Sequence, residues 1–401
     1  STYNGVGINQ ISLDFEDNLY VGGKFRRDNF TFSSVTLNTT GGSDIFVVKL
    51  DEKGVVQWAV TAGGGQDLGG DSYYNDEDIS GLTVHSNGDV YVTGSFHKTA
   101  WFGDYNITSG GYEENINAFV AKLSNEGIWE WVTKVAGQFN GISDIELLST
   151  GDAYVSGYFE TRSSGTIFFD DIELEKTACN WCDFVAKISS NGTWIWAMDS
   201  GIKATTGQDP RIIPDAIAVD SNDILHVVIV AFDGDPYTNV SIAKINENKE
   251  LTWINHFEAN CYLSISGLHI DSAGEIYVHG SAEPNEYYDD EARVIIGNFT
   301  IMPETECGYV CLDSYGGHYS KSTSFIAKLN VSGSWADGIE AVSYSIRDIM
   351  IISNDNIYAT GYIMEPTEFG CEVVTGNPGK RDIFITEISM ENCNPDDKDD
   401  D

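Results

Sequence analysis

Two short cysteine pairs have the spacing in this sequence that comes closest to a chemical motif. Cys179 and Cys182 stand in "CNWC", and Cys307 and Cys311 stand in "CGYVC". Such spacings are typical of zinc ligands, but neither pair has two histidines nearby, and the pairs belong to different parts of the chain. A redox role would place the first pair at a helix N-terminus, which the surrounding pattern does not predict. We therefore expect disulfides that clamp loops.

Three further cysteines bring the total to seven, so one cysteine has no partner within the chain. They are Cys261, Cys371 and Cys393. Cys261 and Cys371 are expected on the same face as the two pairs, which leaves other pairings open. The odd cysteine, Cys393 or Cys261, is a candidate for a bond to a neighbouring molecule.

Acidic clusters are the other candidate ligand sets. They lie at 69–78, 233–235 and 287–291 and offer carboxylates that, with backbone carbonyls, suit Ca²⁺. None has EF-hand spacing, so solvated loop charge is the favoured interpretation and structural calcium the alternative. His97, His226 and His256 are scattered without a serine or cysteine partner. The sequence thus predicts no catalytic residues, no bound metal and no enzyme.

Equivalent lysines and tryptophans recur along the chain. A ring of lysines would bind an anion, but their alternation with apolar residues favours pairing with nearby Asp and Glu. The tryptophans are predicted to pack between neighbouring structural units rather than to bind sugars. The lysines are Lys49, Lys122, Lys187, Lys244 and Lys328, with Glu387 in the sixth place, and the tryptophans are Trp58, Trp129, Trp131, Trp194, Trp196, Trp253 and Trp335.

Two turns, "SNEGIW" and "SSNGTW", are similar to the Asp-box turn of sialidases. Glu126 and Asn191 stand where that turn has its aspartate. Sialidases also need an arginine triad, and only Arg347 stands at a repeated central position among the seven arginines. A glycosidase is therefore the least favoured function.

Charge and composition exclude several classes of partner. The chain has 401 residues and a formal net charge of −40, which argues against nucleic acid and anionic lipid. It has no apolar stretch long enough to span a membrane. Cysteine usage and seven Asn-x-Ser/Thr sequons indicate an extracellular glycoprotein that carries N-linked glycans. The sequon asparagines are Asn29, Asn38, Asn106, Asn191, Asn239, Asn298 and Asn330.

The elements that must position these residues are repeated six times. Repeats start near residues 11, 79, 142, 214, 265 and 346. Each contains two hairpins, the first ending in a Tyr-Val-x-Gly strand in most repeats and the second starting like "NAFVAKL" and usually continuing to tryptophan. The pattern of each repeat therefore predicts four short strands. No segment has a sustained helical period of apolar residues.

Six four-stranded units predict an all-β fold, a six-bladed β-propeller, with a solenoid as the alternative. The sixth repeat lacks its fourth strand. Residues 1 to 7 directly precede the first repeat, so we expect this N-terminal strand to complete the last blade and close the ring. The other possibility is a fragment of a longer array. We predict one domain over 1–393 and an acidic disordered tail over 394–401.

Connections between the second and third strands vary most in length. They span 24–43, 97–116, 160–181, 283–323 and 364–381, with a short one near 233–239. Variable loops on a rigid scaffold commonly carry function, so one face of the molecule is predicted to be decorated and the other plain. Asn191 and Asn330 fall on the plain face, and the other sequons fall on or beside the decorated face.

The strand motifs resemble the SBBP-type β-propeller repeat family. That family combines an Ala-Phe-Val-Ala-Lys-Leu strand, a glycine turn, a tryptophan strand and an Asn-x-Tyr-Val-Thr-Gly strand. The resemblance covers nearly the whole chain and implies a secreted or surface propeller, but no reaction. The cysteines, sequons and long insertions depart from the family pattern and suggest a eukaryotic or viral extracellular version.

The sequence as a whole predicts a non-catalytic extracellular structural or interaction module. Its partners would be other protein subunits, by self-assembly into a filament, flagellar hair or surface coat. The alternative is an adhesin or lectin that binds glycans or a receptor through the decorated face, and a carbohydrate-active enzyme is less favoured.

Overall fold

The computed structural model describes a chain built from short strands. The described residues form 34 β-strands and contain no helix. A membrane-spanning helix is not found among them. They are residues 5–26, 29–33, 35–39, 42–64, 77–109, 116–137, 140–160, 166–175, 181–199, 211–232, 238–259, 261–283, 293–297, 299–301, 323–342, 344–353, 356–363, 367–369, 372–374 and 382–389.

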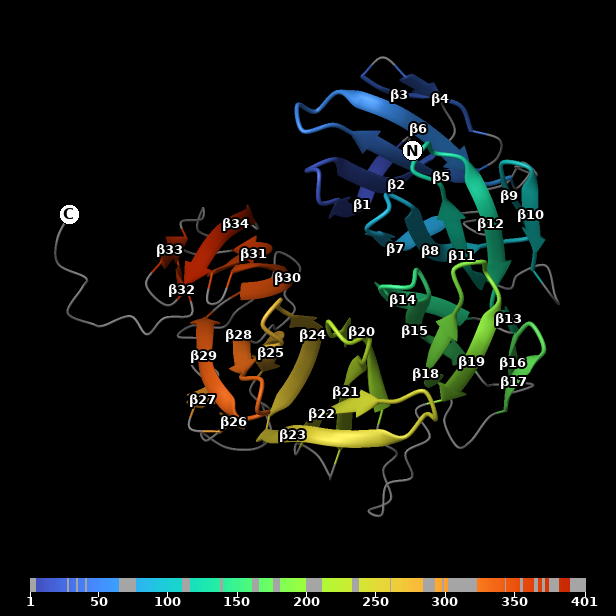
Figure 1. Ribbon diagram of the computed structural model, residues 1–401. Coiled ribbons are helices and arrows are strands. Elements are labelled where there is room, and N and C mark those ends of the chain that lie inside the picture. The colour runs from blue at the N-terminus through green and yellow to red at the C-terminus, as the bar shows by residue number, and fades with distance from the viewer. Residues whose placement is uncertain are drawn as a thin grey trace, which may run out of the picture. The chain divides into compact units, whose positions relative to one another are not determined.

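The chain divides into two compact units, Ser1–Gly201 and Ile202–Asp401. The first unit contains three antiparallel four-stranded sheets and three short hairpins (Figure 1). Its sheets are β1 (Val6–Leu13), β2 (Leu19–Arg26), β5 (Ser43–Leu50) and β6 (Val56–Ala62); β7 (Asp78–Val84), β8 (Val90–Phe96), β11 (Asn117–Leu123) and β12 (Trp129–Lys134); and β14 (Asn140–Leu147), β15 (Ala153–Glu160), β18 (Trp181–Ile188) and β19 (Trp194–Asp199). Its hairpins are β3 (Phe30–Phe32) with β4 (Val35–Leu37), β9 (Thr99–Phe102) with β10 (Tyr105–Thr108), and β16 (Thr166–Phe169) with β17 (Ile172–Glu175), the last also pairing with β13 (Ala136–Gly137).

The second unit continues the same order. Its sheets are β20 (Arg211–Val219), β21 (Leu225–Phe232), β22 (Thr238–Ile245) and β23 (Leu251–Ala259); β24 (Tyr262–Ile270), β25 (Ile276–Glu283), β28 (Thr323–Leu329) and β29 (Trp335–Val342); and β30 (Tyr344–Ser353), β31 (Asn356–Ile363) and β34 (Asp382–Ser389). Its hairpins are β26 (Val294–Ile296) with β27 (Phe299–Ile301) and β32 (Thr367–Phe369) with β33 (Glu372–Val374). The predicted all-β class and the repeated four-stranded antiparallel sheet are confirmed, and both are consistent with a β-propeller.

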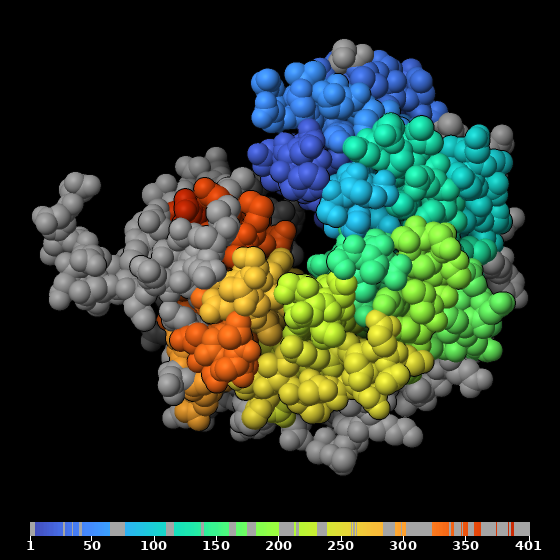
Figure 2. Space-filling view, viewed as in Figure 1, coloured from blue at the N-terminus to red at the C-terminus, as the bar shows by residue number. Residues whose placement is uncertain are grey.

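The third strand of several repeats is buried on both faces. β5, β11 and β28 are buried at every position. The apolar clusters lie between neighbouring sheets: one joins Ile45 and Val47 of the first sheet to Ile79 and Leu82 of the second. Figure 2 shows that the residues of one repeat gather in one contiguous block of the surface. Each sheet therefore depends on its neighbours for burial of its faces.

A β-bulge stands at the same place in the first strand of five repeats, and the fourth repeat has a longer irregularity there, between Ile212 and Ile217. In the second repeat it lies between Ile79 and Gly81. The bulge directs the carbonyl oxygen of Asp78 against Gly94, where a Cβ atom would lie 1.9 Å from that oxygen and 2.7 Å from the Phe119 ring. The glycine of the Tyr-Val-x-Gly motif is thus required by a close backbone approach rather than by an unusual φ angle.

Three of the connections predicted to be variable contain a regular hairpin that pairs with the preceding sheet. Trp101 of β9 bridges to Gly63, which follows β6. Phe168 of β16 pairs with Ala136 in β13, which follows β12. Ile295 of β26 pairs with Glu258 of β23. These three hairpins therefore join neighbouring repeats and are not free decorated loops.

The closing strand is only partly within the described residues. Val6 and Gly7 belong to β1 and pair with Phe25 and Lys24. The prediction that residues 1 to 7 form a separate closing strand is therefore wrong for Val6 and Gly7. The first strand of the first repeat starts at Val6, five residues before the repeat motif at Ile11, because it includes the bulge. The sixth sheet has three strands among the described residues, and the acidic tail at 394–401 lies outside them. The prediction of a single domain over 1–393 stays a prediction.

The close approach at Gly94 gives a direct test of the bulge. A Gly94→Ala substitution is expected to lower the free energy of unfolding by about 3 kcal/mol or more, because the new Cβ overlaps a backbone oxygen that cannot move without breaking the bulge. Urea unfolding followed by tryptophan fluorescence measures the change. The control is Ser95→Ala on the opposite face of the same strand. Equal stabilities of the two variants would contradict the assigned role of the glycine.

Candidate functional site

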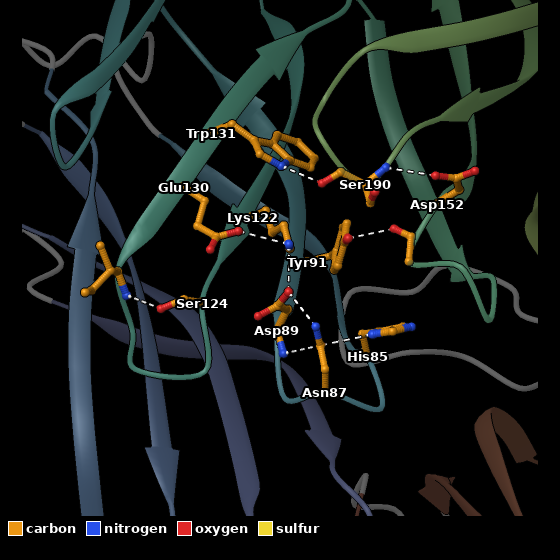
Figure 3. A network of polar contacts seen from close by, with 12 residues as sticks. His85, Asn87, Asp89, Tyr91, Lys122, Ser124, Glu130, Trp131, Asp152 and Ser190 are labelled. Atoms are coloured by element: carbon orange, nitrogen blue, oxygen red, sulfur yellow. Dashed lines mark hydrogen bonds and ion pairs between the residues drawn. The ribbon is translucent and has the colours of Figure 1, made fainter.

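The repeated lysines lie in buried contacts rather than on an open surface. Lys122 of β11 places its Nζ atom 5.7 Å from the centre of the Tyr91 ring, 2.7 Å from Asp89 and 2.9 Å from Glu130 (Figure 3). Burial opposes the charged form, but the hydrogen bonds to the two carboxylates outweigh it, and the pKa of Lys122 is raised. This lysine therefore carries a paired, permanent charge.

The same contact occurs in three other repeats. Lys49 lies over Tyr20, Lys187 over Tyr154 and Lys328 over Tyr277, with Nζ-to-centroid distances of 5.1, 5.4 and 5.4 Å. Lys328 also pairs with Glu275 at 2.5 Å. All four lysines are at most 9% exposed. The prediction that the lysines pair with acidic residues is confirmed at Lys49, Lys122, Lys244 and Lys328, and the anion-binding ring is not supported.

The tryptophans form hydrogen bonds between neighbouring sheets. The indole Nε1 of Trp58 donates to the Asn125 carbonyl at 2.8 Å. That of Trp131 donates to the Ser190 carbonyl at 3.0 Å, as Figure 3 shows. Both acceptors lie in the turn between the third and fourth strands of the next sheet. The turn glycine, Gly127 or Gly192, lies so close to the indole that a Cβ atom would be within 2.8 Å of it.

A second group of tryptophans donates in the opposite direction along the chain. Trp129 donates to the Thr61 carbonyl and Trp335 to the His256 carbonyl, each in the preceding sheet. Packing between repeats is thereby confirmed for these tryptophans. Trp253 is 54% exposed and is the exception.

Most described sequon asparagines are accessible. Asn29, Asn38, Asn106 and Asn191 are exposed, whereas Asn239 and Asn330 are half-buried. The first three belong to or flank the β3–β4 and β9–β10 hairpins. Asn298 lies outside the described residues. An exposed asparagine suits modification, but glycosylation itself stays a prediction.

The cysteines agree only in part with the predicted disulfides. Cys182 is disulfide-bonded. Cys261 is a free thiol with no exposed surface, so its prediction as a disulfide candidate is corrected. It packs in the apolar core of the second unit, and burial raises its pKa to about 12. Cys179, Cys307, Cys311, Cys371 and Cys393 lie outside the described residues.

The acidic clusters proposed for calcium fall almost entirely outside the described residues. At the end of the first cluster, Asp78 pairs with Lys24 at 2.5 Å and accepts a hydrogen bond from Asn9. Its carboxylate is thus occupied by protein groups. The clusters at 233–235 and 287–291 are outside the described part of the chain.

One cluster of potential metal ligands was missed by sequence reasoning. His269, His279 and Asp348 lie in the second unit, and one ligand atom from each falls within 4.8 Å of the others. The two histidines stand in "GLHI" and "YVHG", at strand positions that other repeats fill with different residues. That change of residue type is visible in the sequence and could have pointed to the two histidines. Their contact with Asp348 depends on how two sheets pack and is not visible in the sequence.

Comparisons with known proteins give little further guidance. No protein-family model matches the chain, and no curated protein matches it. The likeness to the SBBP-type family therefore stays a resemblance.

Three solved structures are similar at low identity. A puromycin hydrolase has 8% identity and a TM-score of 0.40, over 97% of this chain and 54% of its own length. A Hadza microbial sialidase has 11% identity and a TM-score of 0.36, over 81% of this chain and 76% of its own. An engineered glycoside hydrolase of the GH43 group has 9% identity and a TM-score of 0.23, over 96% of both chains. This chain thus spans about half the length of the puromycin hydrolase, and these scores indicate nothing about its activity.

The fourth repeat replaces the motif tyrosine with His226. This side chain is 1% exposed, and its Nε2 atom lies 3.8 Å from Asp220. Burial, and secondarily the charge of Lys244, lower its pKa from 6.5 to about 4, against the opposite effect of Asp220. The folded protein therefore keeps this imidazole neutral where the unfolded chain would protonate it.

His226 predicts a specific sensitivity to acid. Between pH 6.5 and about 4 the unfolded chain binds a proton that the folded chain does not, so stability falls as the pH falls through this window, and no contribution remains above it. His226→Tyr restores the tyrosine of the other repeats and is expected to remove up to about 3 kcal/mol of this loss. Urea unfolding at several pH values measures it. The exposed His256→Gln variant should keep the wild-type slope, and an unchanged slope in His226→Tyr would refute the assignment.

Proposed function

We propose that the six sheets form one closed six-bladed propeller that serves as a non-catalytic, extracellular structural or interaction module. The proposed context is a repeating subunit of an extracellular filament, flagellar hair or surface coat. The proposal that the module is structural rests on what the repeated polar and aromatic residues contact. The repeated lysines are used in contacts within a sheet, tyrosine and tryptophan side chains hydrogen-bond to neighbouring sheets, and four sequon asparagines remain accessible at the surface.

Closure of the ring is supported by one uncovered sheet face. Ile11 of β1 is 66% exposed. In four other repeats the residue at the same register position is buried, because the preceding sheet covers it. These residues are 3–7% exposed and are Leu82, Ile145, Leu268 and Ile349. We infer that the sixth sheet covers β1 in the same way, and that the residues before Val6 supply its fourth strand.

The same face explains why closure would be favourable. Ile8, Ile11 and Leu13 of β1, and Phe15 in the turn after it, are all at least 50% exposed. Covering such side chains stabilises a protein by about 1.5–3 kcal/mol each. A ring that left this face open would also leave a long edge and an apolar patch, which natural sheets avoid.

Substitution of Ile11 by aspartate tests closure. In a closed ring Ile11→Asp buries an unpaired carboxylate and is expected to lower the free energy of unfolding by about 3 kcal/mol or more. The matched variant is Leu82→Asp, whose site is already buried. Unfolding is measured at a dilution where light scattering shows a monomer. A change within about 0.5 kcal/mol for Ile11→Asp, with a large change for Leu82→Asp, would contradict closure.

The assembly state tests the structural role. Protein secreted by eukaryotic cells and kept under non-reducing conditions is expected to form oligomers or filaments with a regular repeat. Light scattering and electron microscopy measure this, with mass spectrometry for glycan occupancy at Asn29, Asn38, Asn106 and Asn191. The matched sample is the same protein after enzymatic deglycosylation. A monomer of 44.0 kDa plus glycan at every concentration, in both samples, would refute the structural role.

A further inference from the structure

Two neighbouring sheets of the second unit bring three metal-ligand side chains together. His269 lies on β24, His279 lies on β25 and Asp348 lies on β30 of the next sheet. The two Nε2 atoms are 3.3 Å apart, and the Nε2 atom of His269 is 3.6 Å from the Asp348 carboxylate. The rings are nearly parallel, with centroids 5.4 Å apart. The lone-pair sides of both imidazoles therefore face the same small region.

We propose that His269, His279 and Asp348 form a binding site for one divalent transition metal ion, with Zn²⁺ as the best match. Two imidazoles and one carboxylate are a ligand set that zinc accepts. Tetrahedral zinc with ordinary Zn–N distances of about 2.0–2.1 Å separates two nitrogen ligands by roughly 3.3–3.4 Å. The observed Nε2 separation already has this value.

A missing side chain leaves room at the ligand atoms. Gly267 stands on β24 directly opposite His279. A Cβ atom on Gly267 would lie 2.3 Å from the His279 Nε2 and 3.2 Å from the His269 Nε2. Gln10, Asp144 and Asp348 stand at the equivalent position in three other repeats, and Gly81 stands there in the second repeat. In this repeat the His279 imidazole lies where a side chain at residue 267 would otherwise lie.

One side of the cluster remains open to water. The Asp348 side chain is 72% exposed and that of His269 is 31% exposed. Asp348 can therefore approach a bound ion, and at least one coordination position would be filled by water or by an exogenous ligand. Because the ligands come from β24, β25 and β30, the ion would also join two neighbouring sheets of the second unit.

Direct titration tests the site. Tag-free, chelator-treated, full-length protein is titrated with ZnCl₂ by calorimetry, and with CoCl₂ by visible absorption, which reports the coordination geometry. We expect one Zn²⁺ per chain and a four-coordinate cobalt spectrum. His269→Gln and Asp348→Asn are expected to weaken Zn²⁺ binding by roughly 100-fold and 10-fold. Calcium should not compete, because it prefers an all-oxygen site.

Gly267→Ala is the sharpest variant because it keeps all three ligands and places a Cβ atom against the Nε2 atom of His279. It is expected to weaken Zn²⁺ binding by roughly 100-fold. The exposed His256→Gln on β23 is the matched control and should bind as the wild type does. Thermal unfolding without metal verifies that each variant is folded. If Gly267→Ala is not folded, the binding measured for His269→Gln decides the test.

Two results would overturn the site. One is the absence of stoichiometric Zn²⁺ binding by the wild type, which would leave an ordinary hydrogen bond between two imidazoles. The other is equal binding by the wild type, His269→Gln and Gly267→Ala, which would place the ion elsewhere on this acidic chain. Neither result depends on the assembly state, so the site stands or falls separately from the proposed function.

Discussion

Burial of the third strand on both faces is the constraint from which the other features of the fold follow. A strand such as β5 or β11 has no exposed position, so its sheet cannot be stable as a single layer. Each sheet needs an apolar partner on either side, and the apolar clusters accordingly lie between sheets. The first strand must bend to leave room for this packing, and its bulge places a carbonyl oxygen on a glycine in the second strand. The glycine that ends the Tyr-Val-x-Gly motif is therefore required by a contact between two strands.

Polar groups make the contact between sheets specific. Apolar faces alone would tolerate sliding, whereas an indole N–H that reaches one particular carbonyl does not. Trp58 and Trp131 donate forward to the next sheet, and Trp129 donates back to the preceding one. The short hairpins add backbone pairing in the same direction as Trp129. Buried lysines such as Lys122 and Lys328 are paired with an acid, as burial of their charge requires.

Departures from the repeat mark the places with individual chemistry. The fourth repeat exchanges tyrosine for His226, which remains neutral in its buried position. The fifth repeat has a histidine on each of its first two strands and a glycine between them, and the sixth contributes Asp348. The residues around these positions are the same types that the other repeats have. Function in such a protein is therefore more readily sought where one repeat differs from the others than in the residues that all repeats share.

The sequence by itself determined the strands, the turns, the six repeats and the packing role of the tryptophans, because these depend on residue patterns within about twenty positions of one another. The all-β class and the pairing of lysines with acids followed from the same patterns. Only the tertiary structure decided that Cys261 is a buried free thiol, that three of the connections contain hairpins that pair with the preceding sheet, and that His269 meets Asp348. Those outcomes depend on how a bulge sets the side chains of one strand and on which sheet packs against it. The pattern of one repeat does not encode which side chain of the next sheet meets His269.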